Sequence, residues 1–457
     1  MNKKSFLYFL LYCILNIVFF VLILISKNNL VIIDWVSFLQ LLLTMILSIL
    51  LYKRLLSVFN IFVCLLYLFH FGQSLIRILY PVDTLIDRSV LSNVGTELTA
   101  KAEVLCIVCI FTITIGYVLF NNTFHIANIQ KNIIDIHQDM SVFKKNILLL
   151  FTITLIPMLY IDIQKIAALK VSSYDATYLV YQNGLGKYIG LIGQFCKLLF
   201  PLMIYCYKDD IKKSTKVFVF SSLYLLIAML SGDRGSSVIY LITNVFVYFN
   251  FVKKIKVKNA IFGIFIVYFI LGLISALSIF RYADFTLKNL VESYQFRKSY
   301  GIIYSTLREF GGSLLTLTHA IKYIPSYSPW GMGLTYFLSI FFVSPYIPNF
   351  ITNNFINFIS YTHAFPTYAF EYASLGGSVI GELYYNFGIL TPVFTCILGI
   401  FIKKMDNTFF IYNEPKRVIF YIILLPSFFL WVRDFYVTII FKTFWLSVLI
   451  LYTGRKN

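Results

Sequence analysis

The chain has 457 residues and a formal net charge of +18, and 59% of its residues are hydrophobic while only 13% are charged. Its mean hydropathy of +0.81 lies well above that of soluble domains, so an ordinary soluble fold is excluded. The basic residues are spread thinly along the chain, which argues against nucleic acid as a partner. This composition predicts an all-α polytopic integral membrane protein.

Apolar stretches long enough to cross about 30 Å of hydrocarbon recur along the chain and predict about twelve transmembrane helices. The first is expected to be a retained anchor, because no small-residue cleavage pattern follows it. Nine helices fall in residues 1–280 and three in 374–457, and between them lies one large segment, 281–373. The predicted spans are residues 6–25, 31–52, 56–76, 102–120, 146–164, 188–207, 217–231, 236–252, 259–280, 374–402, 417–432 and 436–452.

The orientation follows from the basic residues, which collect in alternate loops and normally mark the cytoplasmic side. Both termini are then cytoplasmic, and the segment 281–373 is extracytoplasmic. Residues 331–344 are apolar, but counting them as a span would move Lys403 and Lys404 to the outside, so 331–360 is predicted to be re-entrant or interfacial. The basic inward groups are at residues 3–4, 53–54, 131–145, 208–216, 253–258, 403–404, 416–417 and 455–456.

Most arginines, in contrast to the lysines, fall on the outward side. The planar guanidinium grips phosphate through paired hydrogen bonds and keeps its charge, so it suits a pyrophosphate at a membrane surface. Alternatively, each arginine only reaches ordinary lipid phosphates or is compensated by a neighbouring aspartate. The predicted pyrophosphate-binding residues are Arg234, Arg281 and Arg433 at span ends, and Arg297 and Arg308 in the outward segment.

Two glycine-containing stretches accompany these arginines. In GDRG at 232–235, the glycines permit a tight turn and let backbone amides approach an anion. In SLGGSVIGELYYNFG at 374–388, Glu382 lies about two turns inside a predicted span, where a carboxylate is costly. Helical spacing puts Ser378, Glu382 and Asn386 on one face, while Gly377, Gly381 and Gly388 allow close approach. The alternative for Glu382 is a helix-packing seam in which it pairs with an arginine.

The outward segment supplies further candidates. Residues 294–320 are predicted to form an amphipathic helix, and THAFPTYAFEYA at 362–373 contains His363 and Glu371. A partly desolvated carboxylate or a histidine can accept a proton from a hydroxyl, so Glu382 is the first candidate for a catalytic base, followed by His363 and Glu371. No metal or cofactor is predicted: Cys106 and Cys109 have CxxC spacing but lack a second pair or a nearby histidine, and the sequence contains no P-loop and no dinucleotide fingerprint.

The GDRG turn, the LGGSVIGELYYNFG stretch and Arg433 with Asp434 together resemble the bacterial oligosaccharide repeat-unit polymerases of the Wzy type, and the span layout extends this resemblance over nearly the whole chain. The resemblance implies a metal-independent glycosyltransferase of the cytoplasmic membrane with a GT-C-like helical fold. It implies transfer of a growing glycan from undecaprenyl pyrophosphate to an incoming lipid-linked repeat unit at the outer face. A chain-length regulator and a flippase are the further partners implied.

Three other interpretations stay open at this stage. A flippase for lipid-linked oligosaccharides would also use outward cations, but it is expected to carry charges in both halves of its cavity and no single long outward segment. An O-antigen ligase shares the arginines and the large outward segment and differs mainly in its acceptor. A membrane scaffold with no catalytic role explains neither the buried glutamate nor the outward arginines.

Overall fold

The computed structural model describes residues 3–80, 94–120, 133–171, 185–229, 234–254, 272, 287–299, 301–326, 329–339, 376–412, 414–436, 443–448 and 450. Every regular element within these ranges is a helix, as the composition predicts. The chain forms two compact units. Unit 1 comprises Met1–Ala127, Leu307–Asn413 and Trp431–Phe441, and unit 2 comprises Asn128–Thr306, Glu414–Leu430 and Lys442–Asn457.

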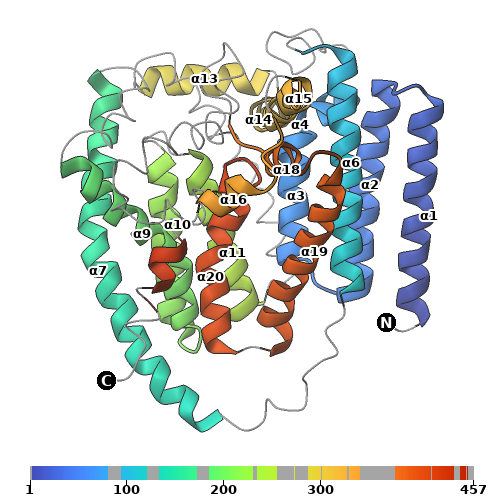
Figure 1. Ribbon diagram of the computed structural model, residues 1–457. Helices are drawn as coiled ribbons and strands as arrows, with labels where there is room; N and C mark the ends of the chain where they lie inside the picture. The colour runs from blue at the N-terminus through green and yellow to red at the C-terminus, as the bar shows by residue number, and fades with distance from the viewer. Residues whose placement is uncertain are drawn as a thin grey trace. The chain divides into compact units, whose positions relative to one another are not determined.

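Unit 1 is built around four long helices, α1, α2, α6 and α19, in which each helix packs against the next (Figure 1). The shorter helices α3, α15 and α18 pack against this row. The elements of unit 1 are α1 (Lys3–Ile25), α2 (Leu30–Tyr52), α3 (Val58–His70), α4 (Gly72–Leu79), α6 (Thr96–Leu119), α15 (Ser313–Tyr323), α16 (Leu334–Ser339), α18 (Val379–Phe387), the short helix η5 (Gly388–Leu390), α19 (Thr391–Asn407) and η6 (Thr408–Tyr412).

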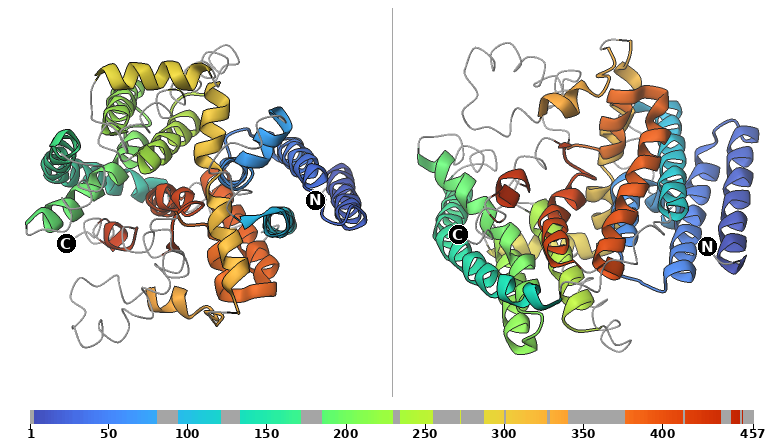
Figure 2. Two further views of the ribbon diagram at one scale, coloured as in Figure 1. Left: turned by 90° about the horizontal axis from the view of Figure 1, so that it is seen from above. Right: turned by 60° about the horizontal axis from the view of Figure 1, so that its bottom comes forward.

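Unit 2 is centred on α9, which packs against α7, α10, α11 and α20. Helix α13 runs across the direction of α10 and α11 (Figure 1 and Figure 2). The unit boundary falls within α14 (Ile302–Phe310). The other elements are α7 (Ile133–Val171), α9 (Leu185–Cys206), α10 (Ile211–Ala228), α11 (Arg234–Phe251), α13 (Leu287–Ser299) and α20 (Pro415–Leu430).

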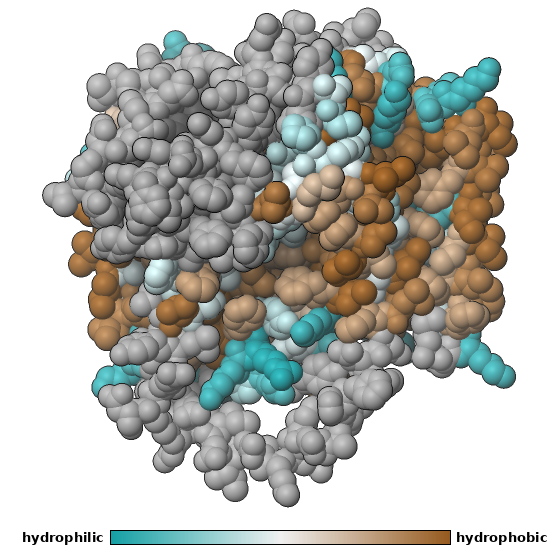
Figure 3. Space-filling view, viewed as in Figure 1, coloured by the Kyte–Doolittle hydropathy of each residue, from teal (hydrophilic) through white to brown (hydrophobic). Residues whose placement is uncertain are grey.

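Within the described residues, five helical stretches are long and apolar enough to cross a membrane: Lys3–Ile25, Leu30–Tyr52, Thr96–Leu119, Phe143–Ala168 and Val379–Ile411. The pair α3 and α4 makes a sixth if its 68° bend belongs to one span. Many side chains of α1 and α2 are large, apolar and exposed, as expected of helices in contact with lipid. Figure 3 shows this apolar surface, with polar residues at the helix ends. The chain is therefore a helical membrane protein.

Helices α6 and α19 approach each other through matching small residues. A methyl group at Gly116 would collide with the Cys396 carbonyl, and one at Gly399 would collide with the Ile113 carbonyl. One turn away, the hydroxyls of Thr112 and Thr395 are 2.6 Å apart. The same Thr-x-x-x-Gly pattern thus occurs on both helices, and its small side chains let the two backbones touch.

Two predicted helices are interrupted. In the span over 374–402 the helix begins only at Val379, with Ser378 as its N-cap, so Glu382 lies in the first turn and not two turns inside. The short helix η5, where Gly388 has a φ of +54°, then separates α18 from α19 within the stretch Val379–Ile411. The single helix predicted over 294–320 is wrong. It is divided into α13, α14 and α15, first at Gly301, whose φ is +92°, and then at Gly311 and Gly312.

Candidate functional site

The start of α18 is capped and tied to α3. The Ser378 hydroxyl oxygen accepts the Gly381 N–H at 3.0 Å, which satisfies one backbone donor left over at the helix start. The same hydroxyl lies 2.7 Å from Nε2 of His70, which is buried at the end of α3. Nδ1 of His70 lies 3.2 Å from the Leu66 carbonyl, which can only accept. In the neutral imidazole the proton is therefore on Nδ1, and Ser378 donates to Nε2.

The turn formed by residues 431–436, which follows α20, lies against the segment that leads into α18. The Val379 N–H donates to the Val432 carbonyl at 3.5 Å. A side chain at Gly377 would collide with the backbone of Asp434, so only glycine allows this approach. The glycine predicted to permit close contact therefore packs against backbone. This contact places the start of α18, which carries Glu382, beside the turn that carries Arg433.

The carboxylate of Glu382 is held by two N–H groups of the 431–436 turn. Trp431 Nε1–H donates to Oε2 at 2.7 Å, and the Tyr436 backbone N–H donates to the same oxygen at 3.1 Å and lies 3.4 Å from Oε1. Among the described residues no arginine pairs with Glu382, so the predicted alternative of an arginine-paired seam does not hold there. Because both donors are neutral, they orient the carboxylate without cancelling its charge.

Aromatic rings surround this carboxylate. The ring of Tyr336, on α16, is edge-on to Tyr436 with centroids 4.8 Å apart, and the Trp431 ring lies 5.4 Å from Tyr436. Helix α16 is held to α18 by the Thr335 hydroxyl, which donates to Asn386 Oδ1 at 2.6 Å. We call Glu382, Tyr336, Trp431 and Tyr436 the Glu382 cluster. Apolar ring faces beside a hydrogen-bonding carboxylate suit a ligand with both apolar and polar faces, such as a sugar.

Arg433 is half-buried, and its guanidinium carbon lies 5.3 Å from the centroid of the Phe69 ring, a cation–π arrangement. Of the other predicted pyrophosphate-binding residues, Arg308 lies on α14 in unit 1 and is half-buried. Arg234 is the first residue of α11 and Arg297 lies on α13, both in unit 2. Arg433 is thus the predicted phosphate-binding arginine that lies on the same turn as the hydrogen-bond donors to Glu382, Trp431 and Tyr436.

Several predicted site residues lie outside the described part of the chain: Arg281, His363, Glu371 and the Gly232–Asp233 part of the GDRG turn. Asn386 lies on α18 with Glu382, whereas Ser378 precedes the helix as its N-cap, and the polar groups of both have structural partners. Ser378 caps α18, and Asn386 Nδ2 donates to the Glu382 carbonyl at 2.9 Å. Glu382 is therefore the residue of this helix face that retains hydrogen-bonding capacity for a ligand.

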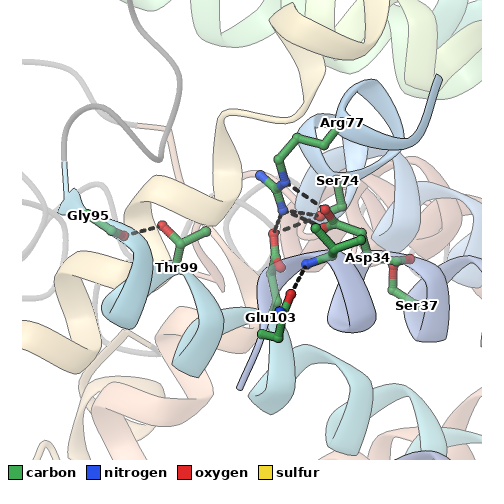
Figure 4. Close-up of polar contacts among 9 residues, drawn as sticks. Asp34, Ser37, Ser74, Arg77, Gly95, Thr99 and Glu103 are labelled. Carbon is green, nitrogen blue, oxygen red and sulfur yellow. Dashed lines mark hydrogen bonds and ion pairs between the residues drawn. The ribbon is translucent and has the colours of Figure 1, made fainter. Parts of the chain in front are cut away.

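A second buried polar group in unit 1 joins α2, α4 and α6 (Figure 4). Arg77 binds both oxygens of Asp34 at 2.8 and 2.5 Å and Oε1 of Glu103 at 2.5 Å, and Ser74 also donates to that Glu103 oxygen at 2.7 Å. The Asp34 and Glu103 side chains are only 4% and 0% exposed. Arg77 is thus engaged by two carboxylates and serves the packing of α4.

Replacing Arg77 by alanine is expected to lower the stability of the protein by about 3–5 kcal/mol, because it leaves two buried carboxylates without a countercharge. The measurement is the unfolding temperature and yield of the purified protein in detergent. Arg417→Ala is the matched control, since Arg417 pairs with Glu414 while 63% exposed and should contribute little. Equal stability of the two variants would contradict the assignment.

Some residues of these contacts are only weakly conspicuous in the sequence. His70 is a histidine within an apolar run, and Asp34 and Glu103 are carboxylates within predicted spans, which alone marks them as unusual. Their partners cannot be read from spacing, because His70 and Ser378 are 308 positions apart. Nothing in the sequence distinguishes Trp431 as a site residue, since aromatic residues are abundant in this chain.

Comparison with known proteins gives one informative result. No curated protein and no solved structure matches the chain. The family model described as O-antigen polysaccharide polymerase Wzy matches residues 7–455, nearly the whole chain. Because this match covers nearly the whole chain, the chain belongs to the Wzy family of O-antigen polysaccharide polymerases.

Proposed function

We propose that this protein polymerises oligosaccharide repeat units by transferring a growing glycan from undecaprenyl pyrophosphate to an incoming lipid-linked repeat unit. The observation that carries the proposal beyond the family is the arrangement of unit 1, where one turn supplies Arg433 and the two donors that hold Glu382. The reaction needs both kinds of group: a cation for the pyrophosphate and an acceptor for the sugar proton.

In the proposed reaction, the acceptor hydroxyl oxygen attacks the anomeric carbon of the growing glycan. The bond from that carbon to the pyrophosphate oxygen breaks, and undecaprenyl pyrophosphate leaves with the electron pair. Glu382 takes the hydroxyl proton, with His363 and Glu371 as the alternative bases. Arginine side chains stabilise the negative charge that develops on the leaving diphosphate, a role that metal ions fill in many nucleotide-sugar transferases.

The proposed pyrophosphate-binding residues are Arg433 first, with Arg234, Arg281, Arg297 and Arg308. The proposal includes about twelve spans in a GT-C-like arrangement, cytoplasmic termini and a reaction at the outer face of the bacterial cytoplasmic membrane. The basic residues in alternate loops support this orientation. A chain-length regulator and a flippase are the protein partners we propose.

The proposal is tested with the purified protein in proteoliposomes supplied with undecaprenyl-pyrophosphate-linked repeat units alone. We expect a ladder of lipid-linked polymers together with release of undecaprenyl pyrophosphate. Product that forms only when a lipid A-core acceptor is added would identify a ligase instead. Movement of the substrate between leaflets without a new glycosidic bond would identify a flippase.

A further inference from the structure

The two oxygens of the Glu382 carboxylate have different surroundings. Oε2 accepts two hydrogen bonds, from Trp431 Nε1–H at 2.7 Å and from the Tyr436 N–H at 3.1 Å. Among the described residues, Oε1 has only the long 3.4 Å approach of the same Tyr436 N–H. With two N–H groups pointing at it, Oε2 is the oxygen on which a proton does not fit. A proton taken up by this carboxylate therefore goes to Oε1.

We propose that Trp431 is a positioning residue that fixes Glu382 through Oε2, so that Oε1 is the atom that receives the proton of the acceptor sugar. This inference rests on the proposed function and adds two details to it: the atom of Glu382 that accepts the proton, and the residue that positions this atom. The electron balance is that of the proposed reaction: the O–H bond of the acceptor breaks, and an Oε1–H bond forms as the glycosidic bond is made.

The position of Trp431 is itself fixed by backbone contacts. Gly377 packs directly on the Asp434 backbone, and the Phe435 N–H donates to the Asp434 carboxylate at 2.8 Å. The indole ring is further held by Tyr436, 5.4 Å away, and is only 9% exposed. A buried ring in a braced turn has few other orientations, so its N–H holds the carboxylate at low entropic cost.

The same turn carries Arg433, whose guanidinium lies over the Phe69 ring. The indole N–H and the guanidinium are therefore two residues apart on one short segment. A shift of this segment would move the proposed base and the proposed phosphate-binding cation together. The geometry thus links the position of the acceptor hydroxyl to that of the leaving pyrophosphate through residues 431–436.

The test is the kinetics of Trp431→Phe, which keeps an aromatic ring and removes the N–H, in proteoliposomes with lipid-linked repeat units. We expect kcat to fall about 10- to 100-fold while KM for the repeat unit stays within about twofold, because a positioning donor acts on the base and not on binding. Trp431→His, which restores an N–H, should recover part of kcat. Trp35→Phe is the control, since that indole is 48% exposed on α2.

Three results would overturn the inference: an unchanged kcat for Trp431→Phe, a loss explained by a lower unfolding temperature in detergent, or no recovery with histidine. Failure of the proposed function looks different. If the wild type makes no polymer, or if Glu382→Gln polymerises normally, the function or the base assignment fails whatever Trp431 does. If both behave as proposed and Trp431→Phe has normal kcat, only the positioning role of Trp431 is wrong.

Discussion

Glu382→Gln is expected to abolish polymer formation, with a fall in rate on the order of 10²- to 10⁴-fold, the usual contribution of a general base. Glutamine has nearly the same shape and can still accept the hydrogen bonds of the 431–436 turn, but its amide cannot take a proton. The measurement is complementation of a polymerase-null strain, with the surface glycan displayed on a gel. The wild type should give a polymer ladder and the variant single repeat units.

The matched control is Glu97→Gln, the same change on a side chain that is 81% exposed and paired with Lys101 on α6. It should give a normal ladder. Protein levels in the membrane must be equal for the three strains, since loss of the protein would also collapse the ladder. A normal ladder from Glu382→Gln would show that another group takes the proton, and His363 and Glu371 would then be tested in the same way.

Arg433→Lys is expected to lower kcat/KM by about 10- to 100-fold although the positive charge is kept. Lysine offers a point charge in place of a planar fork, so it cannot make the paired hydrogen bonds that hold a diphosphate. It also loses part of the packing of the guanidinium over Phe69. The measurement is initial rate against repeat-unit concentration in proteoliposomes of fixed lipid composition.

Arg417→Lys is the control for this second prediction. Arg417 lies at the start of α20, is 63% exposed, pairs with Glu414 at 2.8 Å, and belongs to the basic group 416–417 that is predicted to face the cytoplasm. Its replacement should leave kcat/KM near that of the wild type. If Arg433→Lys also had wild-type kinetics, the simpler interpretation would hold, in which Arg433 only contacts ordinary lipid phosphate and any cation suffices.

Both predictions depend on an arrangement that is compact in space and distant in sequence. The 431–436 turn is about 50 residues from Glu382 along the chain, and α3 is more than 300 residues from α18. Glycine permits close backbone approach at Gly377 against Asp434 and at Gly116 against Cys396. In a membrane interior, where burial of apolar surface gives little preference between helices, such close contacts and hydrogen bonds decide which helices pair.

The sequence by itself determined the class of the protein, since the length of an apolar stretch is a local property. The predicted spans 6–25 and 31–52 agree with α1 and α2, at Lys3–Ile25 and Leu30–Tyr52, within a few residues. It also marked Glu382 and Arg433, because charge in an apolar segment or at its end is conspicuous. The Wzy resemblance, drawn from these residues and the span layout, agrees with the family match.

Only the tertiary structure decided which groups those charges meet. Periodicity does not give the rotation of one helix against another, so it could not show that Arg77 is engaged by Asp34 and Glu103. Nor could it show that a tryptophan N–H orients the carboxylate of Glu382. The short helix η5 between α18 and α19 also escaped prediction, because an apolar window does not register a positive φ at Gly388. The length of an apolar stretch determines whether it can span a membrane. The partners of a side chain depend instead on how helices that are distant in sequence pack together.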